Sequence, residues 1–309
     1  MAHIRLENIN KVYTNNGFHA VHDFSMDIEK GEFVVFVGPS GSGKSTTLRM
    51  IAGLEDITAG NLYINDTLAN HKTPWDRGVA MVFQSYALYP CMSVYENISF
   101  GLSLRGMDKD IIEQRVNKTA KILGLTEYLG RKPRELSGGQ RQRVSILCAL
   151  MLHPQLIIAD EPVSALDVSV QAFILNFMKH LQETYDLTFL FISHDLNVVQ
   201  HVSDDIGVMY FGKIVETTSV DAIYSHPMHP YTKALFSVIP NIHEDKSNHR
   251  QIVLKGDVPN PAKPLAGCPF HTRCPECMDS CMRGEAPALT EAQRGHWVAC
   301  HLYGKPQNK

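Results

Sequence analysis

A glycine-rich run that ends in lysine and serine is the part of the sequence best suited to chemistry. The run consists of Gly38, Pro39, Ser40, Gly41, Ser42, Gly43, Lys44, Ser45 and Thr46. This spacing matches the phosphate-binding loop pattern, in which glycines let successive backbone N–H groups face a phosphate. Lys44 adds a positive charge for the β- and γ-phosphates, and the Ser45 hydroxyl is a ligand for Mg²⁺. A plain glycine-rich turn needs neither side chain, so the run predicts a site for ATP and Mg²⁺.

A pair of carboxylates, Asp160 and Glu161, follows the apolar run Leu156–Ala159. Asp160 stands where an acid directed at Mg²⁺ belongs, and Glu161 is placed to polarise the attacking water as a general base. An acidic pair at the end of a strand is weak evidence by itself. Downstream of a phosphate-binding loop, it predicts ATP hydrolysis.

These groups need a scaffold of buried strands that end beside helices. Phe33–Val37, Leu156–Ala159 and Leu187–Ile192 are continuously apolar, which is typical of central strands buried on both faces. Apolar residues between 170 and 181 follow helical spacing. This alternation predicts an α/β fold with a mostly parallel sheet. Residues 205–211 and 214–216 are expected to pair as a hairpin around Gly212 and Lys213.

The run Leu136-Ser137-Gly138-Gly139-Gln140 decides the class of ATPase. Alone, it would fit a helix cap with Ser137 as the capping residue. Together with the motifs above, it resembles the signature of the ATP-binding-cassette (ABC) family, and the resemblance covers residues 1–240. It implies a nucleotide-binding domain with a mostly parallel central sheet, an antiparallel N-terminal β-subdomain and a helical subdomain at about residues 86–150.

The resemblance also implies roles for single residues. Tyr13 takes the place of the aromatic that stacks on adenine, and Gln84 that of the glutamine that reaches Mg²⁺ and senses the transporter. Asp167 lies in the loop that crosses the dimer interface, and His194 is the histidine that contacts the γ-phosphate. The predicted catalytic residues are therefore Glu161, His194, Gln84 and Lys44. Taken singly, these positions also fit purely structural roles: Tyr13 as an aromatic of an edge strand, Gln84 as a solvated loop residue and His194 as a capped strand end.

The ABC resemblance further implies a dimer, because one chain carries each motif only once. Ser137 and Gly139 of one subunit are expected to close over the γ-phosphate held by Lys44 of the other. The second ATPase subunit is either an identical or a sister chain. Transmembrane permease subunits are the direct partners, and an extracytoplasmic solute-binding protein is an indirect one.

Two parts of the chain resemble different importers. Residues 1 to about 140 are similar to the ATPases of sugar importers, notably at 48–55 and 80–90. From about residue 150 the chain is similar to the ATPases of dipeptide and oligopeptide importers, notably at 163–171 and 226–235. Peptide import is the first choice and sugar import the second. A non-transport ABC ATPase, for iron–sulfur assembly or repair, is the alternative from another class. A repair ATPase is disfavoured, because such chains insert a long coiled coil between the two halves of the site and the stretch from Ser45 to Leu136 is too short for one.

Five cysteines gather near the end of the chain, where a polar segment, 241–248, and three prolines suggest a linker into a small tail, 241–309. In a cytosolic chain such a group more often binds metal than forms disulfides. Resemblance to the tail of peptide importers selects Cys268, Cys274, Cys281 and Cys300 as ligands, with Cys277 as the spare. A [4Fe–4S] cluster is preferred to Zn²⁺, and free thiols come third. Metal is expected to order this tail, which is too small for its own core.

Composition excludes several classes of function. The chain has 309 residues and a net charge of −3, which gives no support for a nucleic-acid partner. Its longest apolar stretches fall far short of the ~20 residues that cross a bilayer, and no secretory signal precedes them. The expected location is therefore the cytoplasmic face of the membrane, held peripherally by another subunit.

Overall fold

The computed structural model describes the chain except for residues 1–2, 15–16, 165, 240–250, 257–264 and 304–309. Its centre is an eight-stranded sheet in the order β11-β12-β10-β9-β3-β8-β7-β6. The pairs β3–β8, β3–β9, β7–β8 and β6–β7 are parallel, and the pairs on the β10 side are antiparallel. The strands are β3 (Phe33–Val37), β6 (Val79–Val82), β7 (Leu156–Asp160), β8 (Thr188–Ile192), β9 (Asp205–Tyr210) and β10 (Lys213–Ser219).

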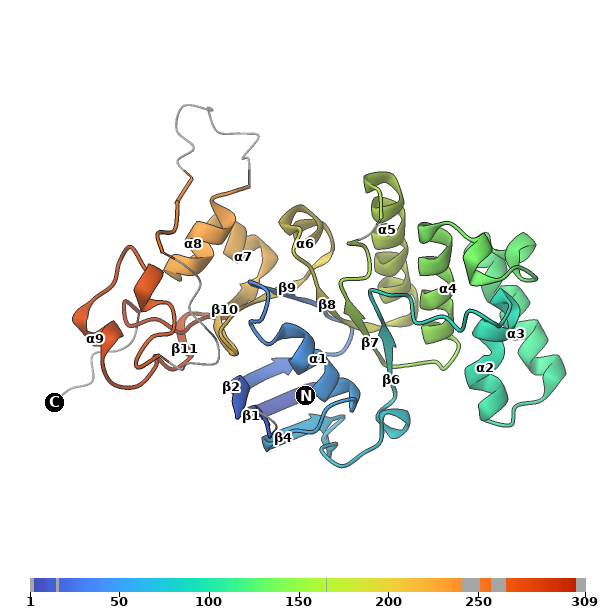
Figure 1. Cartoon of the computed structure of the whole chain (residues 1–309), viewed down its shortest axis with the longest axis horizontal. Coiled ribbons are helices and arrows are strands. Elements are labelled where there is room, and N and C mark those ends of the chain that lie inside the picture. The colour runs from blue at the N-terminus through green and yellow to red at the C-terminus, as the bar shows by residue number, and fades with distance from the viewer. Residues whose placement is uncertain (1–2, 15–16, 165, 240–250, 257–264, 304–309) are drawn as a thin grey trace.

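The middle of the sheet is buried on both faces, as its apolar runs predict. Every residue of β3 and β8 is buried. Figure 1 shows α5 to α8 on one face of the sheet and α1, with the N-terminal strands, on the other. Two apolar cores fill these two spaces. The helices are α1 (Lys44–Ala52), α5 (Val168–Tyr185), α6 (Leu196–Val202), α7 (Val220–Ser225) and α8 (Pro230–Phe236).

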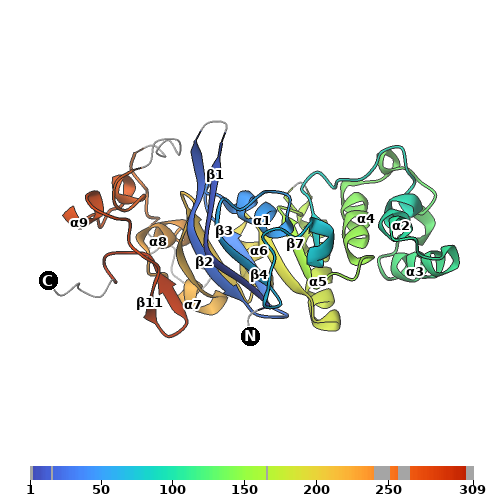
Figure 2. The same ribbon diagram turned by 90° about the horizontal axis from the view of Figure 1, so that it is seen from below.

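A separate antiparallel sheet, in the order β2-β1-β4-β5, covers the side of α1 that faces away from the main sheet (Figure 2). Its inward side chains, among them Ile4, Phe24 and Ile28, are buried with Leu48 and Ile51 of α1. This sheet is the predicted N-terminal β-subdomain. Its strands are β1 (Ile4–Tyr13), β2 (Phe18–Ile28), β4 (Ala59–Ile64) and β5 (Thr67–Leu68).

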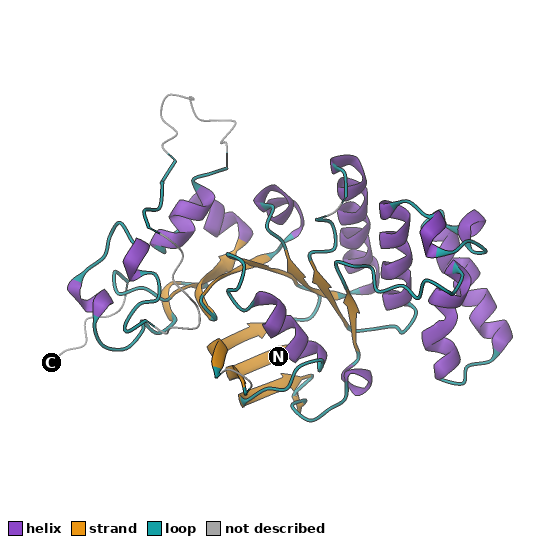
Figure 3. Ribbon diagram, in the orientation of Figure 1, coloured by secondary structure: helices purple, strands orange, loops and turns teal. Residues whose placement is uncertain are grey.

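A helical region lies at the end of the molecule opposite residues 265–303 (Figures 1 and 3). Ser93 begins its first helix with a capping box, and a third apolar core joins its helices. The region corresponds to the helical subdomain expected at about 86–150. It contains α2 (Val94–Leu104), α3 (Lys109–Ile122) and α4 (Gly138–Leu150), with the 3₁₀ turns η2 (Thr126–Tyr128) and η3 (Pro133–Glu135); η1 (Pro74–Arg77) precedes β6.

The part of the tail that the structure describes, residues 251–256 and 265–303, is packed onto the main sheet. We call it the C-terminal extension. Its strand β12 pairs with β10, and Phe270 is fully buried against Tyr210 and Tyr231 of the main core. The extension thus shares the core of the larger body. Its elements are η4 (His271–Arg273), α9 (Asp279–Met282), β11 (Thr290–Gln293) and β12 (His296–Val298).

The linker expected at the start of the tail is not tested. The predicted boundary between residues 240 and 241, the polar segment 241–248 and the three prolines all lie outside the described residues.

Among the helices that are described, none is both long enough and apolar enough to cross a membrane.

Candidate ATP site

The phosphate loop, residues 38–46, connects the buried strand β3 to α1. Its glycines take left-handed or unusual backbone angles, with φ of 146° at Gly38, 79° at Gly41 and 93° at Gly43. A Cβ atom on Gly38 would lie 2.2 Å from the carbonyl oxygen of Met209, so no larger residue fits there. Gly43 begins α1 without a side-chain cap, which leaves the first-turn N–H groups for an anion. The helix begins at Lys44.

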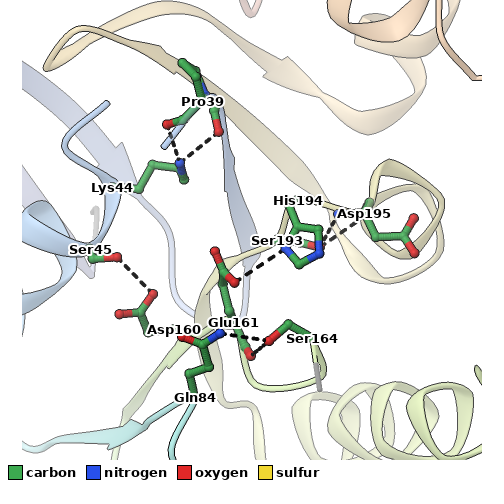
Figure 4. A network of polar contacts seen from close by, with 11 residues as sticks. Pro39, Lys44, Ser45, Gln84, Asp160, Glu161, Ser164, Ser193, His194 and Asp195 are labelled. Atoms are coloured by element: carbon green, nitrogen blue, oxygen red, sulfur yellow. Dashed lines mark hydrogen bonds and ion pairs between the residues drawn. The ribbon is translucent and has the colours of Figure 1, made fainter. Parts of the chain in front are cut away.

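Lys44 points back into this loop. Its Nζ donates hydrogen bonds to the carbonyl oxygens of Gly38 at 2.8 Å and Pro39 at 2.9 Å (Figure 4). Burial lowers the pKa of Lys44, and the carboxylates of Glu161 and Asp160 oppose that shift. The ammonium group is therefore fixed where the loop curls and lies within electrostatic reach of the two acids.

Ser45 and Asp160, two of the predicted Mg²⁺ ligands, are in direct contact. The Ser45 hydroxyl donates to Asp160 Oδ1 at 3.0 Å. Burial raises the pKa of Asp160, while the hydrogen bond from Ser45 lowers it. Gln84, the third predicted ligand, donates to the Ser164 hydroxyl at 3.3 Å instead. Hydroxyl, carboxylate and amide oxygens are the hard donors that suit Mg²⁺, so the chemistry of this set fits the ion.

Glu161 and His194 meet at the ends of neighbouring strands β7 and β8. His194 Nδ1 lies 3.4 Å from Glu161 Oε2. Glu161 has a φ of 49°, and its carbonyl oxygen accepts a hydrogen bond from the Ser164 hydroxyl at 3.0 Å. Ser164 thereby connects the turn at Glu161 with Gln84 (Figure 4). The sequence placed Ser164 in the loop expected to cross the dimer interface, together with Asp167, but its contact with Gln84 depends on the fold, which brings residues 84 and 164 together.

Ser137 and Gly139 lie away from the phosphate loop of their own chain. Ser137 forms a capping box with Gln140 at the start of α4. The atoms nearest to a Cβ built on Gly139 belong to Val170 of α5, the closest at 2.4 Å. Asp167 caps α5, and the hydrogen bonds from Val170 N–H and the Ser169 hydroxyl lower its pKa. Within one chain these residues have capping and packing roles, and Ala165 of the same loop lies outside the described residues.

Tyr13 is the last residue of β1 in the N-terminal sheet. Its ring lies parallel to that of Phe18, with centroids 6.4 Å apart, and Lys11 Nζ lies 5.0 Å from its centroid. The ring is half-exposed, which leaves a face for the predicted stacking.

The structure gives no support to the metal centre predicted at the cysteines. Among the described residues, no group of three or more His, Cys, Asp or Glu side chains is positioned to hold a metal. The physical reason is that Cys268 and Cys281 are packed in the main apolar core, whereas Cys300 is buried in a separate small cluster with Met228 and Val298. Burial raises the pKa of Cys268 to about 11, and the nearby thiols of Cys281 and Cys300 add to the shift. The thiols are thus neighbours without being a preformed ligand set.

A buried polar cluster at the root of the C-terminal extension was not predicted. The Glu216 carboxylate is fully buried and accepts hydrogen bonds from the N–H groups of Met228 and His229, both at 2.8 Å. His296 Nε2 lies 2.7 Å from Glu216 Oε1. The segment around His229 therefore docks against Glu216, and no local spacing in the sequence signals that partner.

The fold and site together define a P-loop ATPase. A glycine loop between a buried strand and a helix carries Lys44 and Ser45, and the neighbouring strand ends in Asp160 and Glu161. Comparison with protein families sharpens this class: residues 21–164 match the ABC transporter family, and residues 215–281 match the family described as "Oligopeptide/dipeptide transporter, C-terminal region".

Similar proteins extend over nearly the whole chain. The oligopeptide transport ATP-binding protein AppF of Bacillus subtilis is 44% identical over 92% of this chain and 89% of its own length. The putative peptide import ATP-binding protein BOV_A0347 of Brucella ovis is 43% identical over 89% of each chain. The chain therefore belongs to the ABC transporter family, as one of its ATP-hydrolysing, ATP-binding chains.

Solved structures show the same fold for the larger body. The ATP-binding cassette MJ0796, in a dimeric post-hydrolysis state with ADP and Pi, is 31% identical, with a TM-score of 0.65 over 70% of this chain and 98% of its own. CbiO1 from Clostridium perfringens is 26% identical, with a TM-score of 0.68 over 73% of this chain and 91% of its own. The relatives that cover both halves are named for peptide transport, so the comparisons give no support to the sugar-importer resemblance of residues 48–55 and 80–90.

Proposed function

We propose that this chain hydrolyses ATP to power the import of oligopeptides or dipeptides, and that it works at the cytoplasmic face of the membrane. The observation that carries the ATPase part is the meeting of Ser45 with Asp160 and of His194 with Glu161 at one edge of the sheet. The peptide assignment is supported by the family match of residues 215–281 and by the names of relatives such as AppF.

Each side chain of the site has a distinct task. Lys44 and the N–H groups of the phosphate loop bind and orient the β- and γ-phosphates. Ser45, Asp160 and Gln84 hold Mg²⁺, which neutralises phosphate charge when it is bound. Glu161 accepts a proton from the attacking water, and His194, 3.4 Å away, orients that carboxylate and donates to the γ-phosphate.

A complete site takes two chains. Gly139 packs against α5 of its own chain and Ser137 caps α4, and the N–H groups at this helix start serve the nucleotide of a second ATPase subunit. The dimeric state of the related cassette MJ0796 supports this arrangement. The partner is an identical or a sister chain, and ATP lies between the two.

Replacing Glu161 with glutamine tests this proposal. The Glu161→Gln protein keeps its phosphate-binding groups and loses the base, so it binds ATP, turns over slowly and accumulates as dimers. Gel filtration with Mg–ATP and a phosphate-release assay measure both effects. A variant that stays monomeric and hydrolyses ATP at the normal rate would contradict the mechanism.

The permease is proposed to dock in an apolar groove between α2, α4 and β6, which we call the helical groove. It has a volume of about 380 Å³, and its walls include Trp75, Phe83, Tyr89 and Leu104. Trp75, Tyr89 and Leu104 are all exposed large apolar side chains. Phe83 in the wall directly precedes Gln84, so a permease segment in this groove is one residue from the catalytic site.

A matched pair of variants tests this docking. Leu104→Glu places a charge in the helical groove and should abolish stimulation of ATPase activity by reconstituted permease, while basal activity persists. Ile122→Glu is the control, because Ile122 is an exposed apolar residue of the same region outside the groove. If Leu104→Glu is stimulated as strongly as the control, the permease binds elsewhere. Stimulation by permease also separates a transporter from a repair or iron–sulfur assembly ATPase.

Substrate class is tested in whole cells, because a solute-binding protein and the permease are proposed to select the substrate outside the ATPase. Cells with the Lys44→Ala chain should lose uptake of labelled oligopeptides and keep uptake of maltose. Loss of sugar uptake with normal peptide uptake would reverse the assignment.

We further propose that Cys268, Cys274, Cys281 and Cys300 hold a [4Fe–4S] cluster, with Zn²⁺ second, after the thiols rearrange. The support is limited to their resemblance to the peptide-importer tail and to their closeness, since the thiols of Cys281 and Cys300 help to raise the pKa of Cys268, and that of Cys281 helps to raise the pKa of Cys300. Metal analysis of anaerobically purified protein decides the question. Iron and sulfide at about four atoms each per chain support it; metal-free, fully folded protein overturns it.

A further inference from the structure

A glutamine side chain inside the molecule lacks hydrogen-bond partners. Gln142, in the second turn of α4, is fully buried, and neither its Nε2 nor its Oε1 bonds to any residue that the structure describes. Gln182 is also buried, yet its Nε2 donates to the Gly31 carbonyl at 2.7 Å and to Asp204 Oδ2 at 2.8 Å. Buried amides are normally paired, because an unpaired one destabilises the fold. Gln142 therefore adds no stability to the single chain that an apolar side chain would not add.

Gln142 lies where α4 meets the loop 161–167, which follows β7. α4 packs against α5 and β6. A Cβ built on Gly138, one turn before Gln142, would lie 3.4 Å from the Leu166 side chain of that loop. One turn after Gln142, Ile146 is buried in the core shared with β6 and β7. Because residues four apart share one face of a helix, Gln142 is buried between these two contacts.

The backbone around this junction is strained. Glu161 begins the loop with a φ of 49°, and Tyr86 and Ala87, which lie just beyond β6, have φ of 65° and 50°. The Tyr86 hydroxyl reaches the start of α4, since a Cβ built on Gly138 would lie 3.3 Å from it. Left-handed backbone at residues other than glycine costs free energy and is concentrated in active sites and switch segments. The single chain thus combines an unpaired amide with strained backbone at one junction.

We propose that Gln142 is a positioning residue for ATP hydrolysis, and that its amide gains hydrogen bonds to the backbone of the loop 161–167 when two chains close over ATP. The inference rests on the proposed function of the two-chain site. Glu161 acts on the nucleotide of its own chain, whereas the helix start at Ser137 and Gly139 serves the nucleotide of the partner. Gln142 therefore links the two ATP sites. Hydrogen bonds that form only in the closed dimer favour that state over the single chain.

Replacing Gln142 with methionine separates this role from a purely structural one. Methionine has nearly the same length and no polar head, so Gln142→Met removes the unpaired amide, and its urea midpoint should rise by about 0.5 M. The monomeric variant should bind Mg–ATP within about twofold of the unmodified affinity, and its kcat should fall about tenfold. Ile146→Met, one turn further along the same face, is the matched control. It should keep its kcat and lose a little stability.

Dimer formation gives a readout that does not depend on turnover. In the Glu161→Gln background with saturating Mg–ATP, Gln142→Met should raise the chain concentration for half-maximal dimer formation about tenfold in gel filtration. A lower urea midpoint for Gln142→Met would overturn the inference, because the amide would then be paired in the single chain. An unchanged kcat would overturn it as well. If the Glu161→Gln chain itself hydrolyses ATP at the normal rate, the underlying mechanism fails, and the role of Gln142 fails with it.

Discussion

Replacing Glu216 with alanine tests how the C-terminal extension is held on the nucleotide-binding body. Glu216 belongs to β10, which pairs with β12 of the extension. Its carboxylate accepts hydrogen bonds from two backbone N–H groups of the segment 228–229 and faces His296 Nε2 at 2.7 Å. The side chains of Glu216 and His296 are both buried, so water does not replace a lost partner.

The expected magnitude follows from these three contacts. A buried donor that loses its acceptor destabilises the fold by about 1–3 kcal/mol, and a hydrogen bond to a charged group contributes about 1.5–3 kcal/mol. Because the three contacts share one carboxylate, we expect a loss of about 4 kcal/mol for Glu216→Ala. Glu216→Gln keeps the shape and one acceptor oxygen, so it should lose about half as much.

Trp297 of β12 is a local reporter, since it pairs with Thr217 directly beside Glu216. In a Trp75→Phe background it is the sole tryptophan, because the chain has two. In urea, Glu216→Ala should shift the Trp297 fluorescence transition to lower concentration than the circular dichroism of the helices. The control is Glu291→Ala on exposed β11. A Glu216→Ala protein with a loss below about 1 kcal/mol and coincident transitions would refute the reasoning.

Three further changes test other parts of the structure. Arg77→Leu removes four hydrogen bonds from a buried guanidinium to carbonyl oxygens, two of them at the end of α1, and should lower the free energy of unfolding by about 3 kcal/mol in urea titrations. Gly139→Ala sets a methyl group 2.4 Å from Val170 and should cost about 1–3 kcal/mol, which Val170→Ala partly restores. Burial lowers the pKa of His229 in the folded chain to about 3, so the unfolded chain takes up the proton first as the pH falls. The contribution of His229 to the free energy of unfolding should be complete above about pH 6.5 and smaller by about 2 kcal/mol at pH 5. The His229→Asn chain should lose less between these two pH values.

Short sequence patterns predicted the strands, turns and helices that are determined by their own residues. The run Phe33–Val37 became the central strand β3, and the glycine turn at Gly212 became the hairpin of β9 and β10. The helix expected from residues 170–181 is α5. Continuous apolar runs and glycine turns determine their own structure, so a single sequence suffices to predict them.

Contacts between distant segments were not predictable in the same way. Glu216 and His296 are 80 residues apart, and neither position lies in a recognisable motif. The strands β11 and β12 have only four and three residues, too few for an alternating pattern to be recognised in the sequence. The tail was expected to need metal because it is too small for a core of its own, whereas its Phe270 completes a core built by Tyr210 and Tyr231. The ligand set of cysteines was inferred from resemblance, and resemblance does not fix side-chain geometry.

The backbone departs from its ordinary preferences where the proposed chemistry is concentrated. Glu161 has a φ of 49°, a conformation that costs a non-glycine residue about 1–2 kcal/mol. Glycine would remove that strain, yet it would also remove the carboxylate that faces His194 at 3.4 Å. The turn is instead held by the Ser164 hydroxyl, which donates to the Glu161 carbonyl at 3.0 Å and accepts from Gln84. Strain retained at a position where glycine would relieve it, and held by a hydrogen bond within the same loop, is expected of a group selected for its chemistry. For this reason we propose Glu161, among the acids at this edge of the sheet, as the residue on which turnover depends.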